Sequence, residues 1–200
     1  TSCCFLPGQP ATAVADEERS LGKSPDGKFE LLLRASSPDD YGWVVIKNRG
    51  NGEVKVTDTA QGYRYFPTDD VEATWKGDST AFAVTVQGTK TTRSTDLYIQ
   101  AGTSWVKLDS PPYLSNILGR QGVFARGRNV VEDFGEFDGD SRFSLFCHVE
   151  PDWEQKAAAE KITEWKPSNQ TDWKVVLEYS RQSSPNCRIV SIEPHGETVD

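Results

Sequence analysis

The stretch SPDGKFELLLRA, from Ser24 to Ala35, places a tight turn directly before an apolar strand. The same arrangement returns in KGDSTAFAVTV from Lys76 and in DGDSRFSLFCHV from Asp138. In each strand, apolar side chains fall on every second position, which puts one face of the strand in a core. Asp-Gly and similar dipeptides supply the positive φ angles that tight hairpins require. The sequence therefore predicts three copies of one β unit.

Two further strands follow each of these. The second strands are YGWVVIKN from Tyr41, TDLYIQ from Thr95 and DWKVVLEYS from Asp172, and the third strands are EVKVTD from Glu53, SWVKLD from Ser104 and CRIVSIEP from Cys187. The predicted fold class is mainly β, with about three repeated antiparallel β-meanders arranged like propeller blades or as a sandwich. The units cover about residues 24–60, 70–110 and 130–193 of a domain that spans residues 24–193.

The Ser-Pro-Asp-Gly turn, the apolar strand after it and the DLYIQ strand at 96–100 resemble blades of β-propellers of the TolB and WD-like kind. In those families the turn joins the first two strands of a blade. The resemblance implies a structural role for the turn Asp and Gly residues. Three units are fewer than the four or so that close a ring. The alternatives are an open stack of meanders, a sandwich with the same hairpin chemistry, or a chain completed by a partner.

Two stretches between the strands predict helices. SPPYLSNILGRQG, from Ser110, predicts a short helix because Leu114, Ile117 and Leu118 share a face and a Gly follows them. The Ala-rich stretch from Pro151 predicts a helix over about 152–165, inserted in the third unit and covering one end or one face of the sheet.

The amino-terminal residues 1–23 show no strand or helix periodicity, and we expect a flexible tether there. Thr1-Ser2-Cys3 resembles the end of a bacterial lipobox, which implies that Cys3 carries a lipid anchor. The alternative is that Cys3 is an ordinary cysteine of an exported protein. The chain contains no Met, which indicates a processed or truncated form. We therefore expect an exported protein of the periplasm or cell envelope, with a C-terminal tail at 194–200.

The composition is 36% hydrophobic and 26% charged, which excludes wholesale disorder. The net charge of −8 argues against nucleic acid as a partner, because phosphates attract a basic face. No apolar run approaches the roughly 18 residues of a membrane helix, so we expect membrane contact only through the lipid anchor. The expected partner is a protein or a cell-envelope glycan.

Cys147 and Cys187 both fall in predicted strands, and a disulfide between them or a buried free thiol is expected. No Cys-x-x-Cys motif is present and the chain has two histidines, so we expect no metal site and no cofactor. His148 alternates onto the face opposite Cys147, which argues against a catalytic pair. His195 falls in the polar tail.

Acidic residues gather at the start of the third unit. Asp133, Glu136, Asp138 and Asp140 are candidate paired acids for glycoside hydrolysis. A hairpin turn preceded by a solvated acidic strand accounts for the same four residues without catalysis.

Aromatic residues around the first unit form the other candidate site. Exposed aromatic side chains with a nearby Arg suit a flat binding surface for a sugar or a protein. Packing where the meanders meet is the competing interpretation. The candidate binding residues are Tyr41, Trp43, Tyr63, Arg64 and Tyr65.

These patterns contain no coherent catalytic set. The leading hypothesis is therefore a non-enzymatic exported protein whose β body binds another macromolecule. The alternatives are an envelope carbohydrate hydrolase that uses the paired carboxylates and a carbohydrate-binding module.

Overall fold

Twelve strands and one helix form within the residues that the computed structural model describes, which are 17–35, 42–50, 54–56, 71–89, 92–121, 129–150, 172–181 and 185–196. The strands are β1 (Glu17–Lys23), β2 (Phe29–Ala35), β3 (Gly42–Asn48), β4 (Val54–Val56), β5 (Val71–Trp75), β6 (Ala81–Thr89), β7 (Thr92–Ala101), β8 (Ser104–Lys107), β9 (Asn129–Asp138), β10 (Arg142–Glu150), β11 (Asp172–Ser180) and β12 (Asn186–Pro194). The helix is α1 (Tyr113–Gln121). The predicted mainly β fold with antiparallel sheets is confirmed.

The strands pair antiparallel with their neighbours in sequence in three runs of four, which we name the first meander (β1–β4), the second meander (β5–β8) and the third meander (β9–β12). The first meander is a separate sheet, and the other two share one sheet with the order β12-β11-β10-β9-β7-β6-β5, in which β8 also pairs with β7. One parallel contact, Arg93 with Val131, joins β7 to β9. The described strands do not close into a ring, because this sheet ends at β5 and β12.

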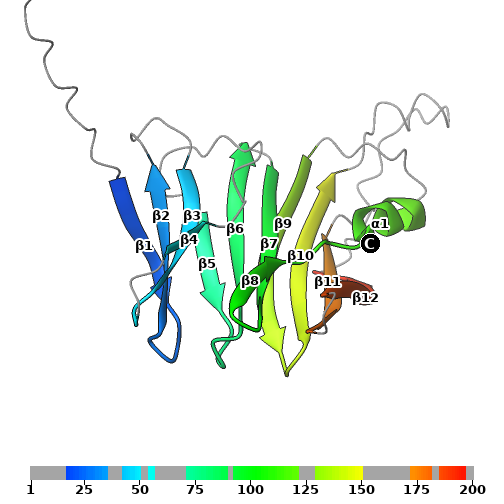
Figure 1. Cartoon of the computed structure of the whole chain (residues 1–200). Helices are drawn as coiled ribbons and strands as arrows, with labels where there is room; N and C mark the ends of the chain where they lie inside the picture. Colours follow the sequence, from blue (N-terminus) through cyan, green and yellow to red (C-terminus); the bar gives the residue numbers. More distant parts are fainter. Residues whose placement is uncertain are drawn as a thin grey trace, which may run out of the picture.

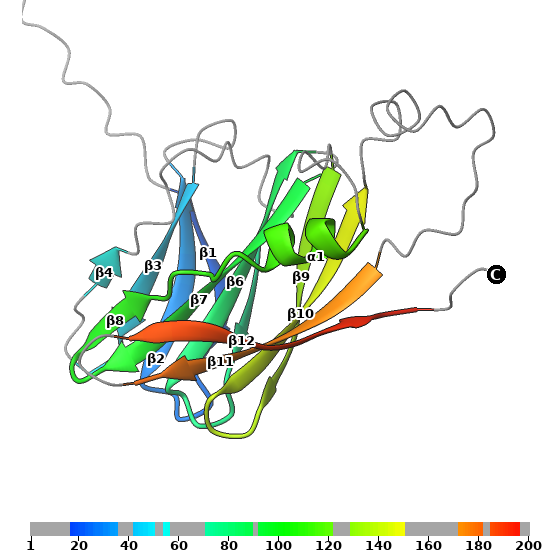
Figure 2. The same cartoon turned by 90° about the vertical axis from the view of Figure 1, so that its right-hand side faces the viewer.

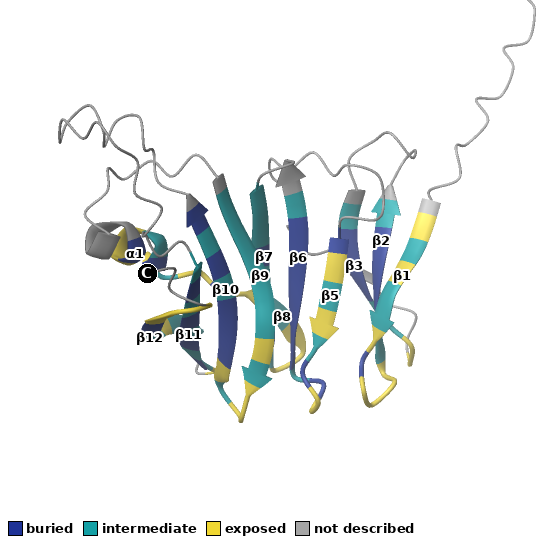
Figure 3. Ribbon diagram, turned by 180° about the vertical axis from the view of Figure 1, so that it is seen from behind, coloured by how far each residue is buried: buried dark blue, intermediate teal, exposed yellow. Residues whose placement is uncertain are grey.

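The turns that the repeated sequence marks lie at one end of the molecule, at the bottom of Figure 1. Each turn joins the first two strands of its meander, as in β1–β2, β5–β6 and β9–β10. Each of these turns includes exposed positions, whereas β6 and β10 are largely buried (Figure 3). The turns therefore form a row along the solvent-facing end of the sheets.

The first and second meanders pack face to face. Leu31, Leu33, Val44 and Ile46 of the first meander share one apolar cluster with Phe82 of β6 and its neighbours. Trp75 and Trp105 pack against this cluster from β5 and β8. Burial of this many large apolar side chains is the main stabilising contribution to the seam between these two meanders.

A second apolar cluster lies on the opposite face of β6, between the second and third meanders. Ala81 and Ala83 of β6 meet Leu145 of β10, and Tyr113 and Ile117 of α1 complete the cluster. All residues from Ala81 to Val86 are buried, because both faces of the strand are covered. In Figures 1 and 2, α1 lies next to β12, at the margin of this seam.

The expected tether at residues 1–23 is wrong for its last seven residues, since Glu17–Lys23 form β1. These residues show no clear alternation because a bulge between Ser20 and Gly22 interrupts their register with β2. Pairing with β2 fixes the strand instead. The first meander therefore begins before residue 24, and its marked turn follows the first strand.

The helix α1 lies within the stretch from Ser110 in which the sequence predicts a short helix. The other helix predicted, over about 152–165, lies outside the described residues. The expected C-terminal tail is wrong at its start, because Pro194 belongs to β12 and the His195 amide donates to the Asp172 carbonyl at 2.9 Å. Residues 197–200 lie outside the described part of the chain.

Candidate functional site on the outer face of the third meander

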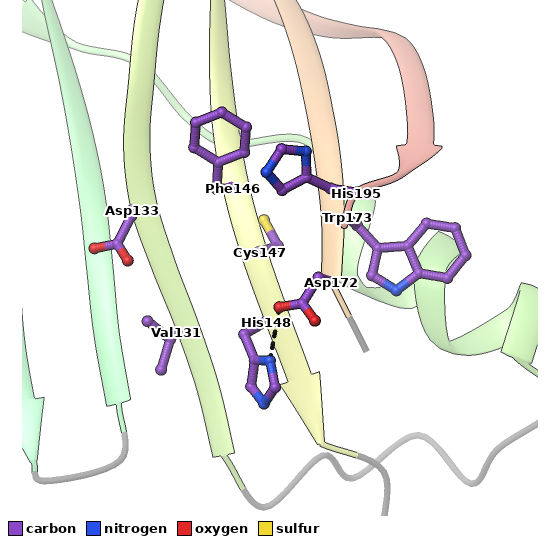
Figure 4. Close-up of a pocket in the computed structure, with 8 residues that line it drawn as sticks. All are labelled: Val131, Asp133, Phe146, Cys147, His148, Asp172, Trp173 and His195. Carbon is purple, nitrogen blue, oxygen red and sulfur yellow. Dashed lines mark hydrogen bonds and ion pairs between the residues drawn. The ribbon is translucent and has the colours of Figure 1, made fainter. Parts of the chain in front are cut away.

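The outer face of the third meander is the side of β9–β12 that points away from the second meander. Alternation along β10 sends Leu145 and Cys147 into the core and leaves Phe146 and His148 on this outer face. A shallow depression lies here (Figure 4). Its lining residues are Val131, Asp133, Phe146, Cys147, His148, Asp172, Trp173 and His195.

Both histidines of the chain flank one aspartate of β11, His148 from β10 and His195 from the position directly after β12. His148 faces Asp172 in the register of β10 and β11, and Nδ1 of its ring lies 2.8 Å from Oδ1 of that carboxylate. On the other side of β11, the amide of His195 bonds to the Asp172 carbonyl. Asp172 orients the His148 ring, as a carboxylate does for a histidine that handles protons. The outer face lacks the nucleophile that would complete a catalytic set among the described lining residues.

Phe146 is the phenylalanine among the residues that line the depression. The His195 ring stacks on it with 4.5 Å between ring centroids and 30° between planes, and the Lys174 ammonium lies 6.0 Å from its centroid. Its other neighbour is Gly135 of β9, where an added Cβ would lie 3.0 Å from Phe146 Cε2 and 2.5 Å from Ser144 Oγ. Glycine at position 135 is therefore required by close approach of β10 side chains.

Ion pairs lie near the depression. Arg93 of β7 holds Asp133 at 2.8 Å, and Lys174 of β11 holds Glu136 at 3.4 Å. Further along β11, Glu178 accepts hydrogen bonds from Arg142 on one side and Arg188 on the other. The face thus combines aromatic and apolar side chains with ion pairs.

The four candidate acids do not converge. Asp133 is paired with Arg93 of β7 and Glu136 with Lys174 of β11, so the two carboxylates are held by different strands. Asp138 and Asp140 are exposed at the β9–β10 turn, where the Asp140 carbonyl accepts from the Tyr179 hydroxyl at 3.0 Å. A close pair of carboxylates facing one cleft, which glycoside hydrolysis requires, is not formed by these residues.

Of the two alternatives expected for Cys147 and Cys187, the structure contradicts the disulfide and has free thiols, with Cys147 buried and Cys187 half-buried. Cys147 faces Trp173 on β11, whereas Cys187 faces Tyr179, six residues further along the same strand. The two cysteines also lie on strands that are not neighbours, and a disulfide needs Cα atoms within about 7 Å. Burial raises the pKa of the Cys147 thiol well above its usual range, which makes this sulfur a poor nucleophile.

The aromatic candidates fall elsewhere. Trp43 is half-buried on β3 in the first meander, where it faces Arg34 of β2. Tyr41, Tyr63, Arg64 and Tyr65 lie outside the described residues, as does Cys3. The structure thus places one of these residues, and that residue lies on a different sheet from the depression.

Sequence reasoning missed Asp172, Lys174 and Phe146 as site residues. Alternation along β10 and β11 indicates which of their residues share a face. It cannot tell which residue of β11 stands opposite His148, because the register is set by tertiary pairing across a connection of 21 residues between Glu150 and Asp172.

Among the described residues, no group of three or more His, Cys, Asp or Glu side chains is placed to hold a metal ion. Within the same part of the chain, α1 is the one helix, and it is too short and too polar to cross a membrane. No family model, curated protein or solved structure matches the chain.

Proposed function

We propose that the chain is a non-enzymatic binding protein of the cell envelope that docks a protein partner on the outer face of its third meander. The observation that carries this proposal is the composition of that face, where Phe146 lines a depression together with His148, Asp172 and Asp133 and further ion pairs lie nearby. Protein interfaces commonly combine an aromatic anchor at their centre with a polar margin. The same composition suits a partner that associates and leaves, since no large apolar patch has to be covered permanently.

The chemistry of the candidate groups supports binding over catalysis. The Cys147 thiol is buried and its pKa is raised, and the candidate acids are each exposed or paired with a cation. His148 and Asp172 form a pair that could move a proton, but the described residues beside them include no accessible nucleophile.

The three meanders are best understood as propeller-blade-like units in an open stack. In favour of this arrangement, the second meander packs on both faces, against the first through Phe82 and against the third through Ala83. The outer face of the third meander carries ion pairs, as terminal repeats of stacked proteins do where they meet water. A partner docked here would occupy the position of a fourth unit.

Site-specific crosslinking tests the docking face. A photoreactive amino acid at position 176, on the outer side of β11, is compared in the native cells with one at position 107 on β8. We expect a protein crosslinked at position 176 and not at position 107. Capture of a glycan at position 176 would favour the carbohydrate-binding alternative, and equal capture at both positions would contradict the proposed face.

Affinity measurements with the purified partner complete this test. Phe146→Ala removes the aromatic anchor, and Lys107→Glu is the matched surface change outside the face. We expect at least a tenfold loss of affinity for Phe146→Ala, because central aromatic anchors contribute about 1–2 kcal/mol or more. Unchanged affinity would exclude Phe146 as the anchor.

We further propose that Cys3 carries the lipid that holds the protein at the envelope. The lipobox-like Thr1-Ser2-Cys3 supports this. Intact mass of the native protein tests it. A diacylglyceryl group plus an acyl chain on the Cys3 peptide is expected, and an unmodified Thr1 terminus would contradict the anchor.

A further inference from the structure

The two ends of the seam between the second and third meanders are joined in different ways. Near the start of β7, Arg93 pairs in register with Val131 of β9, and its guanidinium holds Asp133 at 2.8 Å. Beside this pair, Thr95 Oγ1 donates to the Glu132 carbonyl at 3.1 Å. Backbone pairing, an ion pair and a hydrogen bond thus fix this end of the seam, which we name the hinge end.

The strands β7 and β9 separate beyond the hinge end, because β8 takes the same edge of β7. One edge of β7 pairs with β6 along its length. On the other edge, Tyr98–Ala101 pair with Ser104–Lys107 of β8, which leaves β9 a place only beside the start of β7. In the part of the chain that the structure describes, backbone pairing therefore does not join these two meanders at their turn end, at the bottom of Figure 1.

Arg181 makes the contacts at that turn end. It directly follows β11, and its Nη2 donates to Thr80 Oγ1 at 2.5 Å and lies 3.5 Å from Oδ2 of Asp78, both in the turn of the second meander. The same nitrogen donates to the Asp140 carbonyl in the turn of the third meander at 3.3 Å. Among the described residues, the hydrogen bonds that cross the turn end of this seam all come from Arg181.

The third meander orients the Arg181 side chain for this contact. The guanidinium lies 5.8 Å from the centroid of the Tyr179 ring, two residues earlier in the chain. The Tyr179 hydroxyl donates to the Asp140 carbonyl at 3.0 Å, and this is the oxygen that Arg181 also contacts. On its own side of the seam, Arg181 is thus held by an aromatic face and a shared acceptor.

Apolar packing between the two ends attracts the meanders without fixing their angle. Near the turns, β6 presents Ala81 and Ala83 to this seam, and both side chains are small and buried. Phe143 and Tyr179 belong to the same cluster on the side of the third meander. Hydrophobic attraction is non-directional, so a change of angle costs this packing less than it costs the directional hydrogen bonds at the two ends. The polar contacts therefore decide the angle.

We propose that Arg181 is a latch that sets the angle between the second and third meanders about the hinge end. With the latch closed, the outer face of the third meander is held at one angle to the rest of the body. Without Arg181, the hinge end stays joined and the apolar seam stays buried, but the angle is no longer fixed. The inference does not depend on the docking of a partner, because it concerns the body that carries the docking face.

Residual dipolar couplings of the backbone amides test the latch in the whole chain, because they report the orientation of each meander. In the wild-type protein, one alignment tensor should fit the couplings of all three meanders. In Arg181→Ala, the couplings of β10 and β11 should no longer fit the tensor of β6 and β7. The couplings of β2 and β6 should still share one tensor, since the hydrogen bond from the Asp26 amide to Ser79 Oγ, at 3.0 Å, is untouched.

Arg188→Ala is the matched control, because the 2.8 Å hydrogen bond from Arg188 to Glu178 stays within the third meander. One tensor should still fit all three meanders of this variant. Thr80→Val removes the acceptor on the other side of the seam. It should cause the same misfit as Arg181→Ala to a smaller degree, since Asp78 remains. The double variant should be no more displaced than Arg181→Ala alone.

A single tensor for all three meanders in Arg181→Ala would overturn the proposal. This holds even if urea unfolding shows a loss of stability, because Arg181 would then stabilise the seam without controlling its angle. An equal misfit in Arg188→Ala would overturn the proposal as well. Should Arg181→Ala fail to fold, Thr80→Val decides the question. A misfit between its second and third meanders supports the latch, and a common tensor overturns it.

Discussion

The backbone amide of Asp26 donates a 3.0 Å hydrogen bond to Oγ of Ser79, although the two residues are 53 positions apart. Asp26 lies in the turn of the first hairpin and Ser79 in the turn of the second. Arg181 extends the connection, since its guanidinium reaches Thr80 Oγ1 in the second turn and the Asp140 carbonyl, at 3.3 Å, in the third. The turns marked by the repeated sequence are thus bonded to one another along the end of the molecule.

Ser79 accepts the hydrogen bond that joins the first two turns. Its backbone is strained there, because its φ is +61°. Ser79→Ala loses the hydroxyl and keeps the unfavourable φ, so we expect a loss of about 1 kcal/mol in the free energy of unfolding. Ser79→Gly loses the same hydrogen bond but removes the strain, and its loss should be smaller. Urea unfolding compares both with Ser104→Ala, an exposed control on β8. The interpretation is wrong if Ser79→Gly is the more damaging change.

Gly135→Ala should destabilise the third meander by about 1–3 kcal/mol, because its Cβ would overlap with Ser144 Oγ and press on Phe146. Gly77→Ala is the matched control, since a Cβ there meets nothing within 4 Å. Thermal or urea unfolding gives both values. Combining Gly135→Ala with Ser144→Ala removes the nearest contact and should recover part of the loss. An equal effect of the two single glycine changes would contradict the close approach.

The two strand cysteines should differ in reactivity. Burial raises the pKa of Cys187 to about 11, so its alkylation by iodoacetamide should accelerate up to that pH, well above the range of an exposed thiol. Cys147 should react only on unfolding, because its side chain is buried in the core.

A Cys3→Ser, Cys4→Ser variant contains only Cys147 and Cys187. Mass spectrometry of this variant follows the alkylation of each of the two thiols. Its mass should not change on reduction, since neither cysteine forms a disulfide. A reduction-dependent mass difference would restore the disulfide that the sequence predicts.

The turn acids should make the protein sensitive to strong acid. Hydrogen bonds from the Ser24 hydroxyl and the Lys28 backbone N–H lower the pKa of Asp26 to about 2. Although burial opposes the shift, Lys76 and Thr80 hold the pKa of Asp78 below its usual range. A lowered pKa stabilises the fold above the ordinary value, near 4, and this contribution is lost as the pH falls toward 2.

Unfolding between pH 5 and pH 2 checks this. Asp26→Asn and Asp78→Asn should each be less stable than the wild type at neutral pH and should lose less stability on acidification. Asp138→Asn, at an exposed position at the end of β9, is the same substitution outside the first two turns and serves as the comparison. If the free energy of unfolding of Asp26→Asn and Asp78→Asn falls with pH as steeply as that of the wild type, these carboxylates do not govern acid unfolding.

Local sequence was sufficient to predict the strands in which apolar and polar residues alternate clearly. Phe143, Leu145 and Cys147 occupy every second position of β10, and the structure buries all three. The strand β1 was missed, because its bulge breaks the alternation and only pairing with β2 reveals it.

The similar amino-acid sequences of the turns also suggested a similarity in backbone conformation that the structure does not have. Gly77-Asp78-Ser79 and Gly139-Asp140-Ser141 share three residues, yet the positive φ falls on Ser79 in one and on Gly139 in the other. In the first and second turns, by contrast, Gly27 and Ser79 occupy equivalent positions, and each donates its amide to the carbonyl three residues before it. The conformation of a turn depends on how the flanking strands pair, and the sequence of the turn alone does not specify this pairing.

The sequence by itself determined the strands that alternate clearly, the turns that follow the repeated motif and the mainly β class, because alternation and turn chemistry act over a few residues. Only the tertiary structure decided that Cys147 and Cys187 stand out of register, that both histidines flank Asp172 and that Arg181 of the third meander reaches the turn of the second. These relationships depend on the register of strands far apart in the chain. That register is fixed by how whole faces pack, and no short stretch of sequence contains this information.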